Sequence, residues 1–212
     1  MIMIYDVATN DAEYETRKVS IYYENGVKKR KQLWACPFYV KWMQMLQRCF
    51  CVEYKNKKPT YADVTCCDDW LLFSNFKNWM ESQDYEGKEL DKDLLVFENK
   101  IYSPESCCFV SRHVNSFLTL RKSMRGDYPL GVSYHKRDRV FLSSISGGKD
   151  KKIHLGSFGD KHLAHKAWQM AKLDKCKNLL MSETDPVVAR GLNRIMSKLS
   201  EDINNDVETK SL

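Results

Sequence analysis

The sequence has no apolar run of about 18 residues, the length that a membrane-spanning helix requires. Its opening stretch, MIMIYDVATNDAEYE, lacks the basic region, the apolar core and the cleavage site of a secretory signal. Glycine and proline are scarce, with 9 and 5 among 212 residues, and 43% of the residues are hydrophobic, which excludes a disordered chain. We therefore expect a folded cytoplasmic protein with no membrane partner.

No C-x-x-C pair occurs among the eight cysteines, whose pairs are adjacent or separated by one residue. A structural zinc site is therefore not expected. Disulfide bonds are not expected either, because they belong to oxidising compartments and no secretory signal is visible. Free cysteines are among the most buried residue types, so we predict buried thiols. The cysteines are Cys36, Cys49, Cys51, Cys66, Cys67, Cys107, Cys108 and Cys176.

Positive charge is concentrated in one part of the chain. The formal net charge is +6, but within residues 120–177 fourteen Lys and Arg stand against five Asp, a local excess of +9. The rest of the chain is therefore mildly acidic, at −3. A localised basic segment is typical of a surface that binds a polyanion such as nucleic acid.

The first part of the chain predicts a hairpin followed by two helices. Asn25-Gly26 separates two β-prone runs within residues 18–34, which is a strong hairpin signal. Residues 36–54 place apolar side chains at helical intervals, with Pro37 in the first turn. Residues 69–80 repeat this pattern with a broad aromatic face. We expect the two helices to pack on each other.

The order strand, loop, strand, helix is predicted between Lys88 and Leu120. LDKDLLV is the first strand, FENK a turn, and IYSPESCCFV an irregular second strand. SRHVNSFLTL then has a helical pattern, with Ser111 as its N-cap.

The last third predicts a small sheet followed by two helices. Three short strands cover residues 131–136, 140–146 and 151–158, joined by the charged or glycine-containing segments RDR and GGKD. Asp160 is the expected N-cap of a helix with an Ala-rich apolar face. A last helix is predicted from about Pro186 to Leu199, followed by a polar, frayed tail.

These elements predict an α+β protein, with an N-terminal helical and ββα domain followed by a three-stranded antiparallel sheet packed on a helix. The predicted divisions are 1–120 for the helical and ββα domain, 121–129 for a basic linker, 130–177 for the sheet and helix, and 178–212 for the C-terminal helix and tail.

The predicted sheet resembles the DNA-binding domain of plant APETALA-type ethylene-response factors and their mobile-element relatives. The matching residues are Gly131-Val132, Ile145 at the end of the second strand, the run Leu155 to Phe158, and Ala167-Trp168 in the helix. The order and spacing match over about forty residues. The resemblance implies a sheet that lies in the major groove and is backed by the helix.

The residues support this independently, because Ser133 and His135 alternate on one strand and share a face. Cations at strand ends and turns are placed to contact phosphates, and a two- or three-stranded ribbon fits the major groove. The expected partner is thus double-stranded DNA. The expected DNA-binding residues are Arg121, Lys122, Arg125, Ser133, His135, Lys136, Arg137, Arg139, Lys149, Lys151, Lys152 and His154.

The upstream part is similar to phage homing endonucleases of the HNH class, in the runs WLLFSNFKNWM, LDKD and NKIYSPESCCFV. Together the two resemblances cover roughly residues 34–175. They imply a metal-dependent nuclease, in a host cytoplasm if the protein is of phage origin, that holds Mg²⁺ (or Mn²⁺) between a strand end and a helix. The implied catalytic residues are Asp91, Lys92, Asp93, Asn99 and His113, and the implied metal ligands are Asp91, His113 and Asn115.

The sequence departs from the HNH pattern at the general base. No histidine precedes His113, and Lys92 stands where the usual base histidine is expected. An ammonium group beside two carboxylates cannot readily accept a proton. Either Asp93 activates water instead, or Lys92 only neutralises phosphate. His162 and His165, three residues apart, have the spacing of a zinc-binding pair, but without a third ligand we interpret them as surface or phosphate-facing residues.

Three functions remain open on the sequence. The first is a sequence-selective homing endonuclease that cleaves phosphodiester bonds at a site chosen by the C-terminal module. The second is a non-catalytic DNA-binding or regulatory protein on a degenerate HNH scaffold. The third is an inhibitor or adaptor that uses its basic face on an acidic protein. A monomer is favoured, although the sequence does not determine the oligomeric state.

Overall fold

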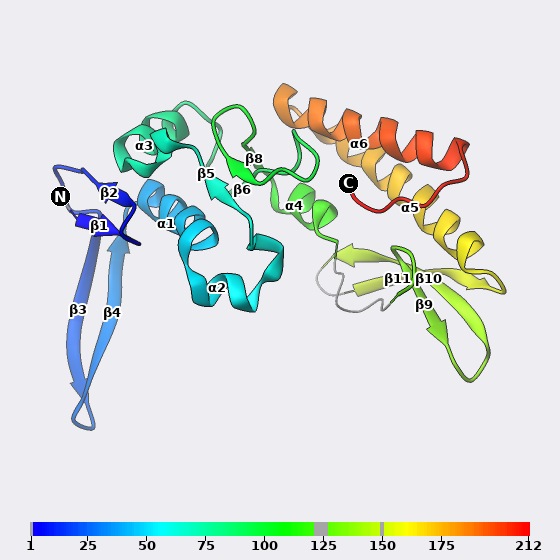
Figure 1. Ribbon diagram of the computed structural model, residues 1–212, viewed down its shortest axis with the longest axis horizontal. Helices are drawn as coiled ribbons and strands as arrows, with labels where there is room; N and C mark the ends of the chain where they lie inside the picture. The colour runs from blue at the N-terminus through cyan, green and yellow to red at the C-terminus, as the bar shows by residue number, and fades with distance from the viewer. Residues whose placement is uncertain (1, 121–126, 149–150) are drawn as a thin grey trace. The chain divides into compact units, whose positions relative to one another are not determined.

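A computed structural model describes residues 2–120, 127–148 and 151–212 (Figure 1). The protein mixes helices with several small sheets, as the α+β prediction requires at this coarse level. The chain forms two compact units: unit 1 holds residues 1–86 and 99–107, and unit 2 holds 87–98 and 108–212. Each unit is described by itself.

Unit 1 is built around two helices. The predicted helix after Pro37 is present, but the chain bends at Cys51 and a second short helix follows. The helix predicted from Asp69 begins at Phe73, since residues 68–71 form a 3-10 turn. The elements of unit 1 are β1 (Ile2–Ile4), β2 (Ala8–Asn10), β3 (Arg17–Glu24), β4 (Val27–Ala35), α1 (Pro37–Phe50), α2 (Val52–Lys57), β5 (Thr65–Cys66), α3 (Phe73–Glu81) and β7 (Ile101–Tyr102), with 3-10 turns at Pro59–Tyr61 and Asp68–Leu71.

Aromatic side chains join α1 to α3, which confirms that these two helices pack on each other. Phe73 of α3 meets Trp42 of α1 with ring centres 5.4 Å apart, and both are buried. The Trp42 indole N–H donates to the carbonyl oxygen of Trp70 at 2.7 Å, so its polar atom is satisfied in the core. Burial of these aromatic side chains contributes apolar stabilisation to unit 1.

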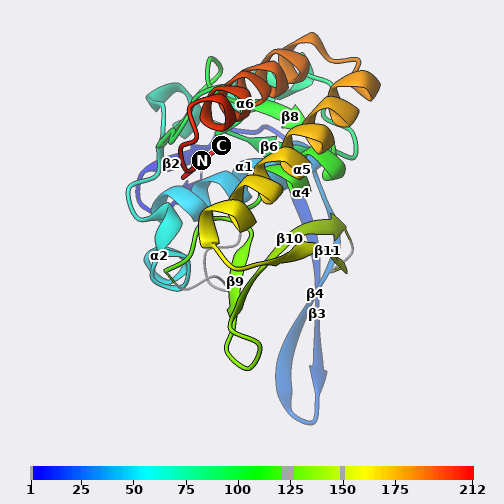
Figure 2. The same ribbon diagram turned by 90° about the vertical axis from the view of Figure 1, so that its right-hand side faces the viewer.

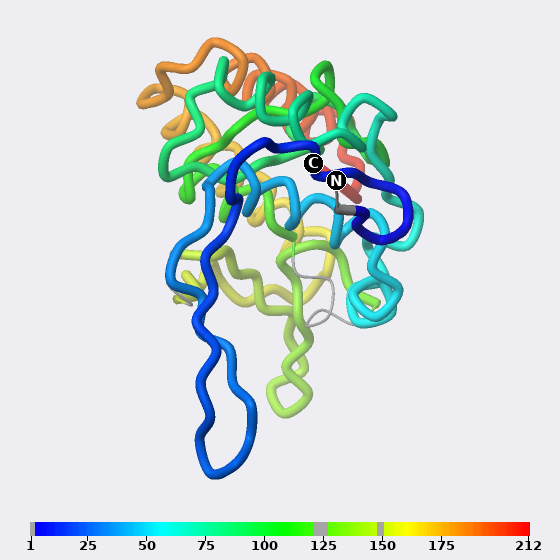
Figure 3. The backbone as a smooth tube through the Cα atoms, turned by 90° about the vertical axis from the view of Figure 1, so that its left-hand side faces the viewer, coloured from blue at the N-terminus to red at the C-terminus, as the bar shows by residue number. Residues whose placement is uncertain are grey.

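The predicted hairpin at Asn25-Gly26 is confirmed. β3 and β4 pair antiparallel from Arg17 to Ala35, with one register shift next to Lys18. Asn25 and Gly26 both have positive φ, at 51° and 75°, as a two-residue type I′ turn requires. In Figures 1 and 3 this ribbon extends away from the helices of its own unit.

Unit 2 contains the strand–strand–helix segment, the three-stranded sheet and two long helices. Its first two strands pair antiparallel, and a separate sheet has the order β11-β10-β9. The elements are β6 (Glu89–Asp91), β8 (Cys108–Val110), α4 (Arg112–Leu118), β9 (Val132–His135), β10 (Val140–Gly148), β11 (Lys151–Phe158), α5 (Lys161–Ser182) and α6 (Pro186–Asn204).

One apolar core joins the strand–strand–helix segment to the long helices. Leu94, Val110 and Phe117 share a buried cluster with Leu192 and Ile195 of α6. The compact units therefore do not follow the predicted boundary at residue 120, because β6, β8 and α4 pack with the C-terminal helices. The predicted second strand is also divided: residues 101–102 pair with β5 in unit 1, whereas β8 pairs with β6.

The three-stranded sheet packs on α5, as predicted (Figure 2). Val132 and Ile145 on the sheet and Trp168 on the helix are buried at this contact. Gly131 has a φ of +78°, and a Cβ atom at this position would lie 2.0 Å from the Trp168 ring. Glycine is therefore required here both for its backbone conformation and for the close approach of the helix.

The tail after α6 is ordered, which corrects the expectation that it frays. Thr209 is fully buried, and its hydroxyl donates to the Asp202 carboxylate at 2.7 Å and accepts from the Gln169 side chain at 2.9 Å. His165 is also buried, not on the surface as expected. Its Nδ1 donates to the Leu130 carbonyl and its Nε2 accepts from the Thr209 N–H, at 2.9 and 3.0 Å.

The cysteines agree with the prediction of free thiols. None of the eight forms a disulfide bond, and all but Cys51 and Cys67 are buried. Ser111 and Asp160 are confirmed as N-caps, because their side chains accept hydrogen bonds from the first turns of α4 and α5. None of the helices in the described part of the chain is long and apolar enough to cross a membrane.

Replacing Thr209 with Val should lower the free energy of unfolding by about 1–3 kcal/mol, because the isosteric change leaves the Asp202 and Gln169 side chains without their buried partner. Urea denaturation at pH 7 measures the loss. Lys210→Ala, a change at the exposed neighbouring position, is the matched control and should have little effect. Equal stability of Thr209→Val and wild type would contradict the docked tail.

Candidate nucleic-acid interface

The three-stranded β9–β11 sheet of unit 2 has one face against α5 and one open face. The pairing register places Ser133 opposite Leu142, Ser144 opposite His154, and Ser146 opposite Lys152, and paired residues lie on the same face. Ser143 and Ile145, which alternate with these positions on β10, are buried toward α5. The open face of the described strands therefore comprises Ser133, His135, Val140, Leu142, Ser144, Ser146, Lys152, His154 and Ser157, and none of these is acidic.

The turn between β9 and β10 holds more cations together with one carboxylate. Lys136, Arg137 and Arg139 are exposed there, and Arg139 has a φ of +55°. Asp138 accepts from the Arg137 side chain at 3.0 Å and contacts the His135 ring at 3.1 Å. Asp138 thus orients two of the predicted DNA-binding side chains. Of the remaining predicted residues, Arg121, Lys122, Arg125 and Lys149 lie outside the described residues.

A groove of about 890 Å³ lies between α4, the ends of β10 and β11, and α5. Its floor is apolar, with Phe117, Leu130 and Trp168. No Asp or Glu is among its described lining residues, so the positive potential inside it is not neutralised locally. The cationic lining residues are Arg112, Lys151, Lys152, Lys172 and Lys175.

Lys172 is a buried cation in this groove. Its Nζ donates to the carbonyl oxygen of Phe117 and lies 4.0 Å from the centre of the Phe117 ring. Burial, and to a smaller extent the nearby Lys175 ammonium, lower the pKa of Lys172 from 10.5 to about 7. Lys172 therefore connects α5 to α4 through this hydrogen bond. Its charge depends on pH near neutrality.

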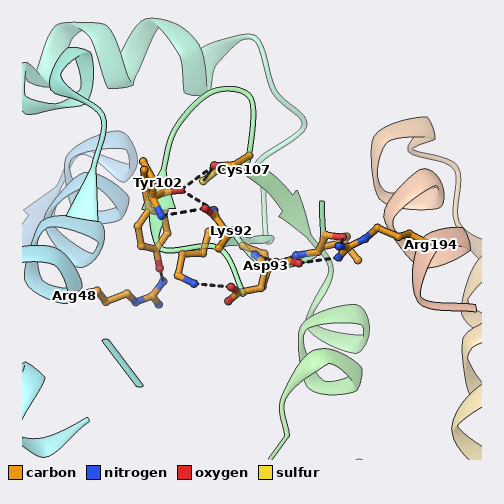
Figure 4. A network of polar contacts seen from close by, with 11 residues as sticks. Arg48, Lys92, Asp93, Tyr102, Cys107 and Arg194 are labelled. Carbon is orange, nitrogen blue, oxygen red and sulfur yellow. Dashed lines mark hydrogen bonds and ion pairs between the residues drawn. The ribbon is translucent and has the colours of Figure 1, made fainter. Parts of the chain in front are cut away.

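Asp91 ends β6, and Lys92 and Asp93, labelled in Figure 4, begin the turn that follows it; these are the first three residues of the predicted nuclease site. Asp91 Oδ1 accepts from the backbone N–H groups of Asp93 and Leu94, at 2.9 and 2.7 Å. This capping ends the strand at Asp91, so β6 is shorter than predicted. Lys92 is buried and donates to the Asp93 carboxylate at 2.5 Å, and Arg194 of α6 donates to the carbonyl oxygens of Asp93 and Leu94.

The predicted metal ligands do not converge. His113 and Asn115 are two residues apart on α4, so their side chains leave the helix axis in directions roughly 200° apart. His113 lines the basic groove, and Asn115 does not. Asn99, in unit 1, bonds the backbone of Ile101 through both side-chain atoms. Among the described residues no group of three His, Cys, Asp or Glu could hold a metal ion.

The chemistry at Asp91 also disfavours a cation. Burial raises the pKa of Asp91, although its backbone hydrogen bonds oppose the shift. Asp91 Oδ1 is already engaged by the two backbone N–H groups, and no other His, Cys, Asp or Glu side chains among the described residues complete a group of three with it. The donor set present here therefore does not fit the Mg²⁺ or Mn²⁺ that the resemblance implies.

The prediction from sequence missed three residues of this surface. Arg112 of α4 and both Lys172 and Lys175 of α5 line the groove, but no motif links the two helices in the sequence. Lys172 and Lys175 were included only in the count of basic residues within 120–177, and Arg112 lies outside that segment. A second missed feature is the positive charge of the β3–β4 ribbon. It was hidden because the charges of all residues outside 120–177 were summed to −3.

No protein-family model, no curated protein and no solved structure matches this chain in the comparisons made with each. The two family resemblances of the sequence therefore stay predictions.

Replacing Lys172 with Met, an apolar side chain of similar length, should change how stability depends on pH. In the wild type the folded state releases the Lys172 proton near pH 7, whereas the unfolded chain keeps it to about pH 10.5. The unfolded state thus binds more protons, and this one group should raise the free energy of unfolding by up to about 1.4 kcal/mol per pH unit above pH 7.

Urea unfolding between pH 6 and 9.5 tests this. The stability of Lys172→Met relative to wild type should be highest at pH 6 and should decline steadily toward pH 9.5. Lys175→Met, which removes a half-buried cation whose Nζ donates to Ser146, is the matched control. A Lys172→Met difference that stays constant with pH would rule out a buried amine that titrates near neutrality.

Proposed function

We propose that this protein binds double-stranded DNA, with the open face of the β9–β11 sheet against the duplex. The observation that carries the proposal is the composition of that face: on the described strands it presents serine, histidine and lysine side chains beside Val140 and Leu142, and no carboxylate. Serine, histidine and lysine can donate hydrogen bonds to base edges and phosphates, whereas a carboxylate would be repelled by the phosphate backbone.

The second support is the basic groove at the end of the same sheet. Lys152 lies on the open face and also lines the groove, and Lys151 precedes it on β11 and lines the groove as well, so the two surfaces meet at this strand. A duplex bound at the sheet would release counterions from the phosphates that these lysines contact. Affinity is therefore expected to depend strongly on salt.

Fluorescence anisotropy on a labelled duplex over a series of salt concentrations tests the proposal. Changing Lys151 and Lys152 together to Gln should weaken binding to all sequences and reduce the slope of log affinity against log salt by about two. The matched control changes Lys177 and Lys210, two exposed lysines of unit 2 that neither lie on the open face nor line the groove. The control should retain the wild-type slope.

Two results would overturn the proposal. One is an unchanged slope in the Lys151/Lys152 variant, which would place the duplex elsewhere. The other is competition by polyglutamate as effective as competition by unlabelled duplex. That result would favour an adaptor for acidic proteins, whose affinity requires no duplex geometry.

Phosphodiester cleavage is a second candidate, and the order of elements favours it. The antiparallel pair β6–β8 is followed directly by α4, as the nuclease resemblance implies, and Asp91 lies at the end of β6. The side chains argue against it, because Asp91 caps its own turn and Lys92 is buried in an ion pair with Asp93. The scaffold and the site chemistry therefore point in different directions.

Incubation of the protein with plasmid DNA in Mg²⁺, Mn²⁺ or EDTA separates these readings. Given the donor set, we expect no metal-dependent nicking, together with intact salt-sensitive binding. Asp91→Asn is the appropriate variant, because an amide oxygen can still accept the two backbone hydrogen bonds that Asp91 accepts. Cutting that needs a metal and disappears in Asp91→Asn, with unchanged thermal stability, would instead establish the nuclease.

A further inference from the structure

The β3–β4 ribbon of unit 1 is exposed along its whole length. Its only half-buried positions are Ser20 and Ala35. It also exposes large apolar side chains: Ile21, Tyr23 and Leu33 are 53%, 70% and 63% accessible. An isolated two-stranded hairpin is marginally stable in water, so a ribbon of this kind gains stability from a partner. Ile21 and Tyr23 lie two residues apart on one strand and therefore share a face, and exposed apolar side chains grouped in this way are typical of an interaction site.

The ribbon is also strongly basic. Residues 17–35 contain six Lys and Arg and a single acid, Glu24, which pairs with Lys29. Four of the cations are consecutive on β4. Because successive side chains on a strand point to opposite faces, Lys28 and Arg30 lie on one face, and Lys29 and Lys31 lie on the other.

The register places each cation beside a particular neighbour. Arg30 pairs with Ile21 and Lys28 with Tyr23, so one face combines apolar or aromatic side chains with two cations. On the other face Lys29 pairs with Tyr22, and Lys31 pairs with Ser20. Both faces can therefore make van der Waals and electrostatic contacts at the same time.

We infer that the β3–β4 ribbon is a second DNA-binding element, an arm that enters the major groove of a duplex and contacts phosphates through the cations of β4. A two-stranded antiparallel ribbon has the width to fit the major groove. A strand of eight residues spans roughly 26 Å, which is sufficient to follow the groove over several base pairs. Cations on both faces can reach phosphate oxygens while the aromatic and apolar side chains contact base edges.

Charge decides between this partner and a second copy of the chain. Pairing two ribbons through their β4 edges would bring two runs of four cations together. Like charges placed opposite each other destabilise a sheet. Lysines on an edge strand are a known protection against such pairing. The net charge of the ribbon is complementary to a polyanion and opposes self-association.

The full-length protein and a labelled duplex provide the test. Two double variants, Lys28→Gln with Arg30→Gln and Lys29→Gln with Lys31→Gln, each remove the cations of one face. Each should lower the salt slope of binding by about two. Lys57→Gln with Lys58→Gln, at exposed positions of the same unit, is the matched control and should bind like the wild type.

Trypsin provides an independent readout, because residues 28–31 supply four adjacent cleavage sites on the exposed ribbon. Cleavage there should be rapid in the free protein and suppressed by duplex DNA, with the products identified by mass spectrometry. Unprotected cleavage at saturating duplex, together with wild-type slopes in both double variants, would overturn the arm. A dimer in sedimentation equilibrium that either double variant abolishes would also overturn it, in favour of self-association.

The arm and the sheet surface can fail separately, because the variants lie in different units. Loss of binding in the arm variants with no loss in the Lys151/Lys152 variant would support the arm and reject the proposed sheet site. The reverse pattern would reject the arm alone. Loss in both supports a protein that holds one duplex, or two, through two elements.

Discussion

The shared apolar core of unit 2 is the constraint on which its surface depends. Val110 and Phe117 are buried with Leu192 and Ile195, so the strand–strand–helix segment cannot separate from the long helices without exposing them. α5 contributes Cys176 to this core and Trp168 to the core under the sheet. One helix therefore connects the two layers, and the groove between α4 and the sheet exists because both layers pack on it.

Electrostatics acts on this frame in two ways. Exposed cations on β11 and at the groove, such as Lys152 and Arg112, have no Asp or Glu beside them among the described lining residues of the groove. Buried polar groups are instead satisfied internally, as Asp91 is by two backbone N–H groups and His165 is by Leu130 and Thr209. Burial also lowers the pKa of His165, which keeps the ring neutral and able to accept from Thr209. The protein thus separates charges that hold it together from charges that face outward.

Local features of the fold were predictable from the sequence, and long-range features were not. The Asn25-Gly26 turn, the Asp160 cap and the three alternating strands each follow from residues close together in the chain. The pairing of β5 with β7, and the hydrogen bonds from Gln169 and to His165 that bury Thr209, join residues 36 or more positions apart, for which a single sequence contains no signal. At the candidate site the cationic strands could be predicted from the sequence. The convergence of α4 and α5 on the groove could not, because it depends on how the two helices pack.

The bond between His165 and Thr209 has a consequence for biosynthesis. The ring lies early in α5, yet its acceptor nitrogen is satisfied only by a backbone amide 44 positions further along the chain. Until translation has passed that point, the imidazole has water as its partner and α5 lacks the segment that covers it. Vectorial synthesis therefore sets an order of events: the arm and the aromatic helices of unit 1 can fold on the ribosome before the sheet-bearing unit closes over its last buried hydrogen bonds.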